Sequence, residues 1–237
     1  MSDSQDTQVL YEVLAGSQDP MIWNPMSEEK LRRAADYLRV DDAERVLDLG
    51  CGRGRLLCDW AERFRVQGTG VDINQDFIAL ARQDADARGV GGLLDFVIAD
   101  LASYVPPVAQ YDIVTCVGAS DAMGGFFSAI VQMAKATRPH GRILVGDAYQ
   151  NDQDLAKRVR AGAENGLDLI GMIHGSDDEW DAYYSAQWRA AYEWGLRYPD
   201  RPERERLLER MRQHQVRYVE QGRPRARWVT LIFARQD

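Results

Sequence analysis

The sequence lacks the spacings of cysteine and histidine that hold metal ions or redox centres. Its 237 residues include three cysteines and three histidines. The cysteines form no CxxC motif, and the histidines fall in no HExxH or HxxxH spacing. The cysteines are Cys51, Cys58 and Cys116, and the histidines are His140, His174 and His214. We therefore expect free thiols in a reducing compartment and no metal site.

Long apolar runs and an excess of basic residues are also absent. No stretch approaches the roughly 20 apolar residues of a membrane helix, and residues 1–8 lack the basic and apolar regions of a secretory signal. The net charge of -8 argues against nucleic-acid binding, because such proteins cluster Lys and Arg. We expect a cytoplasmic protein, a monomer or a homodimer, that binds a small-molecule substrate and has neither a nucleic-acid nor a membrane partner.

The most informative stretch present is a strand–turn–helix pattern at residues 46–57, VLDLGCGRGRLL. An apolar run ends in glycines at every second position, Gly50, Gly52 and Gly54, and an amphipathic segment follows. Glycine adopts backbone conformations closed to other residues and lets a ligand lie against the main chain. The following helix directs unpaired N–H groups into the same space. The pattern predicts a site for a nucleotide-like ligand.

An acidic residue at the end of the second expected strand narrows the choice of ligand. Asp72, in GVDIN, stands where a carboxylate hydrogen-bonds the hydroxyls of a ribose. A nicotinamide enzyme usually has GxGxxG, whereas Leu57 occupies the place of the third glycine, and the missing Gly-Lys-Ser/Thr excludes a P-loop. An adenosine-type ligand is favoured.

The same strand–helix unit recurs along the chain and predicts an α/β fold with a parallel sheet and right-handed crossovers. Strands are expected at residues 46–49, 66–73, 96–99, 111–117, 141–147, 167–174 and 227–234. Ser27 is expected to cap an amphipathic helix that packs beside the first strand.

About fifty residues separate the last two expected strands, which is long for a loop. Trp180, Tyr184, Trp188 and Tyr192 recur at every fourth position and share one helix face. A second helix is expected at residues 203–219, so the insertion is interpreted as a helical cap. The aromatic face either packs as core or contacts a flat or cationic substrate, and both hold if it roofs the site.

Five successive motifs, VLDLGCGRGRLL, GVDIN, VIADL, YDIVTCVGASDAMGG and HGRILVGD, resemble those of class I S-adenosylmethionine-dependent methyltransferases. NPMSEEKL, GASDAMGG and SDDEWDAYY further resemble a bacterial subgroup that acts on small molecules. The resemblance implies a Rossmann-like seven-stranded, mostly parallel sheet with an antiparallel last strand, helices on both faces, and a helical cap inserted before that strand. The corresponding parts are an N-terminal helical arm or lid (1–44), the cofactor-binding core (45–176), the cap (177–224) and the last strand (225–237).

The resemblance also implies the cofactor, S-adenosylmethionine, and its contacts. Gly50 and Gly52 would pass the methionine part, Asp72 would hold the ribose, and Asp100 would bind the adenine amino group. Asp48 would orient the turn or the ammonium group. The expected cofactor-binding residues are Asp48, Gly50, Cys51, Gly52, Asp72, Ile73, Asp100, Leu101 and Val117.

Two residues are candidates for catalysis. A sulfonium is already electrophilic, so alignment and exclusion of water are the main requirements, but an acid at the mouth of the fourth strand can take a proton from the nucleophile. Asp121 occupies that place, where many relatives have His, and His174 ends the sixth strand. The alternatives are that Asp121 caps the following helix or faces solvent, and that His174 is structural.

The expected substrate-binding residues are Trp23, Trp180, Tyr183 and Tyr184. Trp23 either belongs to a lid or anchors the N-terminal arm to the core. The sequence thus predicts a methyltransferase that transfers a methyl group to an oxygen or nitrogen of a small acceptor by direct in-line displacement. The alternatives are an enzyme of the same fold that uses the cofactor for other chemistry, such as a cyclase or decarboxylase, a non-catalytic binding protein, and, more distantly, a nicotinamide oxidoreductase.

Overall fold

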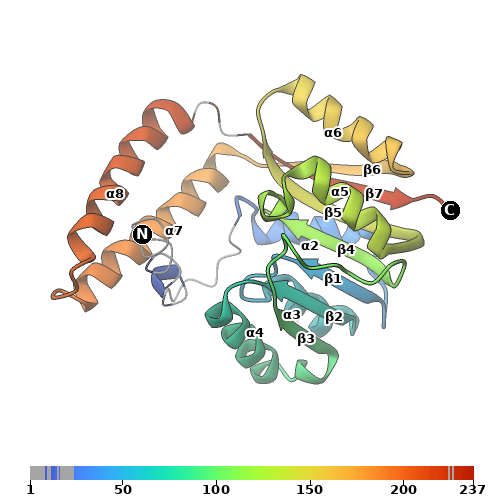
Figure 1. Cartoon of the computed structure of the whole chain (residues 1–237), viewed down its shortest axis with the longest axis horizontal. Coiled ribbons are helices and arrows are strands. Elements are labelled where there is room, and N and C mark those ends of the chain that lie inside the picture. Colours follow the sequence, from blue (N-terminus) through green and yellow to red (C-terminus); the bar gives the residue numbers. More distant parts are fainter. Residues whose placement is uncertain (1–8, 10–11, 15, 17–23, 224, 226) are drawn as a thin grey trace. The chain divides into compact units, whose positions relative to one another are not determined.

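The structure is a computed structural model of the 237-residue chain and describes residues 9, 12–14, 16, 24–223, 225 and 227–237. It comprises two compact units. Ile22–Gly175 and Arg227–Asp237 form the first, called here the core unit, and Met1–Met21 and Ser176–Ala226 form the second, called here the helical unit. Figure 1 labels their helices and strands.

The core unit is built on a seven-stranded sheet with the strand order β3-β2-β1-β4-β5-β7-β6. The strands are β1 (Arg45–Leu49), β2 (Gln67–Asp72), β3 (Leu94–Ile98), β4 (Tyr111–Val117), β5 (Thr137–Tyr149), β6 (Leu167–His174) and β7 (Arg227–Arg235). Pairing is parallel from β3 to β5, and β7 runs antiparallel to both β5 and β6. The predicted mostly parallel sheet with an antiparallel last strand is confirmed.

Helices cover both faces of this sheet (Figure 1). They are α2 (Glu28–Leu38), α3 (Arg55–Phe64), α4 (Gln75–Ala87), α5 (Phe126–Ala136) and α6 (Asp152–Glu164), with short 3-10 helices η1 (Gly91–Leu93) and η2 (Ser120–Met123). Since side chains of a strand alternate between the two faces, the nearly continuous burial of β4 follows from this double cover.

Helix α2 begins as predicted, with the Ser27 side chain accepting a hydrogen bond from the Lys30 N–H. Its expected place beside the first strand was wrong, because α2 packs chiefly against β5, β6 and β7. Met26, directly before the helix, lies with its Sδ 3.0 Å from the Thr230 hydroxyl of β7. This contact fixes the entry of the helix at the antiparallel half of the sheet.

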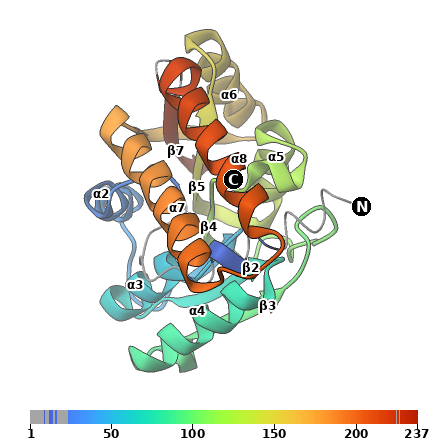
Figure 2. The same cartoon turned by 90° about the vertical axis from the view of Figure 1, so that its left-hand side faces the viewer.

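The helical unit contains α7 (Asp177–Arg197), α8 (Arg204–Arg217) and a π-helical turn, η3 (Tyr218–Gly222). Two helices between β6 and β7 were predicted, and Figure 2 shows them side by side. A capping box starts α7, because the Glu179 N–H donates to the Ser176 hydroxyl while the Ser176 N–H donates to the Glu179 carboxylate.

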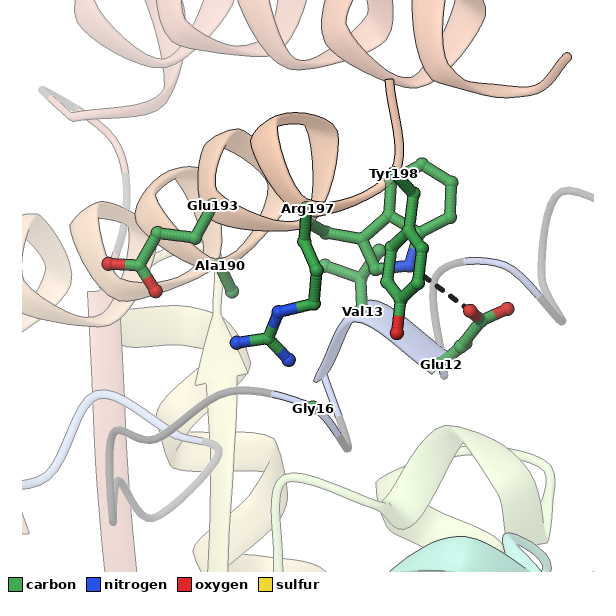
Figure 3. Close-up of a pocket in the computed structure, with 8 residues that line it drawn as sticks. Glu12, Val13, Gly16, Ala190, Glu193, Arg197 and Tyr198 are labelled. Carbon is green, nitrogen blue, oxygen red and sulfur yellow. Dashed lines mark hydrogen bonds between the residues drawn. The ribbon is translucent and has the colours of Figure 1, made fainter. Parts of the chain in front are cut away.

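The N-terminal residues described in the helical unit pack on α7. Val9 and Val13 are buried with Ala190, Ala191 and Trp194. The Trp194 indole N–H donates to the Glu12 carboxylate over 3.2 Å, the contact drawn in Figure 3. A small pocket of about 140 Å³ lies beside it. No pattern in the sequence predicts that these N-terminal residues pack against α7.

The core of the α5–α6 face provides a test of packing. Phe233 of β7 is fully buried, and a Cβ on Gly162 of α6 would lie 2.4 Å from its ring. Phe233→Ala is expected to lower the free energy of unfolding by about 3–5 kcal/mol, because it leaves a cavity under α6. Phe127→Ala, at a side chain 50% exposed, is expected to cost less than about 1 kcal/mol. Urea unfolding of both variants checks this, and equal losses would contradict it.

Candidate functional site

The candidate site lies where the strand order reverses. From β1, the chain adds β2 and β3 on one side and β4 and β5 on the other. Connections from the carboxyl ends of β1 and β4 therefore leave in opposite directions. In open α/β sheets, ligands bind in the crevice at this position.

The turn between β1 and α3 is held tightly against its neighbours. Gly50, Gly52 and Gly54 have φ of +76°, +53° and +70°, the left-handed region that favours glycine. A Cβ on Gly50 would lie 2.2 Å from the Cβ of Ala119, which follows β4. The Gly50 N–H donates to the Val71 carbonyl of β2 over 2.8 Å. The turn is therefore a bare stretch of backbone fixed between two strands.

Asp72 connects the end of β2 to this turn. One carboxylate oxygen accepts the Gly52 N–H at 2.9 Å, and the other accepts the Asn74 N–H at 2.9 Å. Burial raises the pKa of Asp72, and these backbone hydrogen bonds oppose the rise. The carboxylate is thus held in one orientation before any ligand binds.

Asp48 of β1 is a buried carboxyl group beside the turn. Its Oδ1 accepts the Thr115 hydroxyl at 2.6 Å. Burial raises its pKa to about 7 against the Thr115 hydrogen bond, and the charge of Asp72 adds to the rise. Among the described residues Asp48 forms no ion pair, so a cationic group placed beside it would stabilise its charged form.

The remaining cofactor candidates lie at or directly after the carboxyl ends of β1, β2, β3 and β4. Cys51 and Leu101 are buried, Val117 is half-buried, and Ile73 and Asp100 are exposed. Burial and the charge of Asp48 raise the pKa of the Cys51 thiol, so it is an inert packing group. The structure brings all nine predicted cofactor residues to one edge of the sheet.

The two catalytic candidates are not adjacent. Asp121 is exposed in η2 after β4. His174 is exposed at the end of β6, with Nδ1 3.3 Å from the Tyr149 hydroxyl, and β5 and β7 lie between their strands. The alternative that Asp121 caps the next helix is wrong, because Gly125 occupies the N-cap of α5 without a side-chain bond.

Of the substrate candidates, Trp23 lies outside the described residues, and the other three belong to α7. Tyr184 stacks on Trp180 and on Trp188 at centroid distances of 5.6 and 6.1 Å. Tyr218 and His214 contact the same ring at 4.7 Å. Tyr183 contacts the Trp180 and Tyr184 rings as well. The aromatic face therefore forms a packed cluster within the helical unit, apart from Tyr192, which is exposed.

Sequence reasoning missed three polar residues near the ends of β4 and β5. The Ser120 hydroxyl donates to the Asp147 carboxylate, and Arg158 Nη1 lies 3.6 Å from the same carboxylate. Burial raises the pKa of Asp147, opposed by the Ser120 hydrogen bond and the Arg158 charge. Asp147 closes the motif HGRILVGD, which was a usable signal. Arg158 gave no such signal, because only the tertiary fold brings its side chain from α6 to β5.

Two classes of feature are not found in the part of the chain that the structure describes. No group of three or more His, Cys, Asp and Glu side chains is arranged to hold a metal ion. No helix combines the length and the apolar character needed to span a membrane.

Comparisons with known proteins define the class. The family model for the methyltransferase domain matches residues 40–195, well over half of the chain. A solved S-adenosylmethionine-dependent methyltransferase from Geobacter sulfurreducens, in complex with S-adenosyl-L-homocysteine, superposes with a TM-score of 0.86 at 28% identity, covering 95% of this chain and 98% of that one. The chain belongs to the methyltransferase domain family and is an S-adenosylmethionine-dependent methyltransferase.

Two relatives match the chain in sequence. The protein YjhP of Escherichia coli (strain K12) is 32% identical over 198 residues, covering 76% of this chain and 79% of the relative. The 27-O-demethylrifamycin SV methyltransferase of Amycolatopsis mediterranei is 30% identical over 156 residues, covering 64% of this chain and 56% of that enzyme.

The residues at the strand ends fit S-adenosylmethionine. The glycine turn, with its positive φ angles, presents bare main chain at the carboxyl end of β1, which suits the methionine part of the cofactor. The fixed Asp72 carboxylate suits ribose hydroxyls, and the buried Asp48 suits an ammonium group.

The raised pKa of Asp48 makes the stability of the ligand-free protein depend on pH. A carboxyl whose pKa rises from 3.8 to about 7 on folding favours the folded state less and less as pH increases through that window. Asp48→Asn removes this loss, so its stability relative to the parent should grow by about 2–3 kcal/mol between pH 5 and pH 8. Urea unfolding at both pH values measures it, with the exposed Asp95→Asn as control. A constant difference across pH would contradict the burial argument.

Proposed function

We propose that this methyltransferase transfers the methyl group to an oxygen or nitrogen of a small-molecule acceptor by direct in-line displacement. The observation that carries the proposal is the fixed arrangement of the glycine turn, Asp72 and Asp48 at the reversal of the strand order. The Amycolatopsis relative is named for methylation at an oxygen of rifamycin, which supports an oxygen acceptor.

The chain's own residues have distinct roles in this proposal. The backbone at Gly50 and Gly52 would lie along the methionine part of the donor, and Asp48 would pair with its ammonium group. Asp72 would hold the ribose, while Asp100 and the exposed Ile73 would contact the adenine. S-adenosylmethionine supplies a methyl group already activated by positive sulfur. The protein therefore contributes mainly orientation and exclusion of water.

Asp72→Ala tests the cofactor part of this proposal. The change removes a ribose partner and the acceptor of two backbone N–H groups, so the glycine turn also loses its anchor. We expect affinity for S-adenosylhomocysteine, measured by titration calorimetry, to fall at least about 100-fold, since hydrogen bonds to charged groups contribute about 1.5–3 kcal/mol each. Asp95→Ala, on an exposed position of β3, should bind as the parent does. Unchanged affinity in Asp72→Ala would contradict the assignment.

A labelling experiment tests the reaction itself. The protein is incubated with methyl-labelled S-adenosylmethionine and the small-molecule fraction of a bacterial extract. Label in a small-molecule product supports methyl transfer. Consumption of a substrate without movement of label would instead favour cyclase or decarboxylase chemistry.

A further inference from the structure

A polar trio in the core unit lies at the carboxyl ends of β4 and β5, outside the cofactor residues described above. Ser120 comes from η2, Asp147 from β5 and Arg158 from α6. The Ser120 hydroxyl donates to Asp147, and the Arg158 guanidinium lies 3.6 Å from the same oxygen. Three separate elements therefore converge on one carboxylate.

Arg158 is fixed on several sides. It is only 9% exposed, and its Nη2 donates to the Ala148 carbonyl over 2.6 Å. Its guanidinium also lies 4.8 Å from the Phe126 ring centroid and 3.3 Å from Asp154. Its Nε and Nη1 have no hydrogen-bond partner and no contact with solvent. These contacts hold the Arg158 guanidinium beside Asp147, so its charge acts on that carboxylate and not on a separate ligand.

Asp147 is the one member of the trio that is both reachable from solvent and held in a fixed orientation. Its side chain is 18% exposed, whereas Ser120 is 1% exposed and cannot be reached from solvent. Asp121 in η2 is close enough for its charge to raise the pKa of Asp147, but it is itself exposed and surrounded by water. A carboxylate that is partly desolvated and oriented is the better proton acceptor of the two.

We propose that Asp147 accepts the proton that the methyl acceptor loses, and that Ser120 and Arg158 are positioning residues that orient its carboxylate. This inference rests on the proposed function. It also restricts the acceptor to a group that carries a transferable proton on its nucleophilic atom, such as a hydroxyl or an ammonium, in preference to a carboxylate.

A lone pair on the acceptor oxygen or nitrogen forms the new bond to the methyl carbon, and the carbon–sulfur bond breaks with its electron pair left on sulfur. A hydroxyl acceptor passes its proton to an oxygen of Asp147 as the new bond forms. An ammonium acceptor passes its proton to Asp147 first, which frees the nitrogen lone pair for the attack. In both cases the proton later goes to water. The products are the methylated acceptor and S-adenosylhomocysteine.

The charges around Asp147 fix the direction of its pH response. Burial raises its pKa, Ser120 and Arg158 oppose the rise, and Asp121 adds to it. The buried Cys116 thiol of β4 is protonated, because burial raises its pKa, and contributes no charge. As pH increases through the raised pKa, the basic carboxylate forms. The methyl-transfer rate should therefore rise over the same pH interval.

Asp147→Asn is the central variant. With methyl-labelled S-adenosylmethionine and the small-molecule extract fraction, we expect the rate of label transfer to fall at least about 100-fold, the usual contribution of a general base, and the rising limb of the pH profile to disappear. Affinity for S-adenosylhomocysteine, measured by calorimetry, should stay within about twofold of the parent, since the cofactor residues are untouched.

Ser120→Ala tests positioning separately from folding. Loss of the hydroxyl removes a hydrogen bond to the charged carboxylate, which raises the pKa of Asp147 further. The rising limb should move to higher pH with activity retained, an effect that a purely structural role would not produce. Asp95→Asn is the control, because Asp95 is an exposed carboxylate of β3, remote in the sheet from β5, and its rate and profile should equal those of the parent.

The outcomes are separable. Parent-like rate and pH profile in Asp147→Asn would overturn this inference alone, as would loss of the rising limb in Asp121→Asn but not in Asp147→Asn. If the parent protein binds S-adenosylhomocysteine yet moves no label, the proposed function fails and this inference fails with it.

Discussion

The structure of the site depends on one constraint: the backbone between β1 and α3 must pass through a space with no room for a side chain. Ala119 limits that space on one side, and the Val71 carbonyl anchors the turn on the other. Asp72 then ties Gly52 to β2. These contacts join β1, β2 and β4 at their carboxyl ends, so the packing of the sheet and the shape of the cofactor site are determined together.

The same packing at the ends of β1 and β2 also brings two acidic side chains close together. Asp48 and Asp72 lie near enough for the charge of one to raise the pKa of the other, and burial raises both. Such an arrangement costs free energy in the empty protein. S-adenosylmethionine carries positive charge on its ammonium and sulfonium groups, so we expect its binding to offset that cost. The placement of Asp48 near Asp72 thus has two consequences. It raises the free energy of the ligand-free site, and it favours the binding of a cationic donor.

Much of the fold follows from local pattern, and the parts that do not are tertiary. The strands at residues 111–117 and 167–174 have the predicted bounds, because apolar runs and turn residues are local signals. The placement of α2 did not follow, since it depends on Met26 contacting β7. Within the site, the glycine turn and Asp72 were readable as a motif, whereas the contact of Arg158 with Asp147 exists only after α6 has packed on the sheet.

The aromatic residues show the limit of a periodic pattern most clearly. Their spacing correctly placed Trp180, Tyr184 and Trp188 on one helix face, yet each of these rings already has ring partners within the helical unit, including His214 and Tyr218. A ring that stacks on a substrate would have to exchange such a contact for the new one, and only the difference would contribute to affinity. In our proposal, removal of the acceptor's proton requires only Asp147, Ser120 and Arg158, which are polar residues of the core unit. The predicted substrate contacts and the proposed proton acceptor therefore belong to different units.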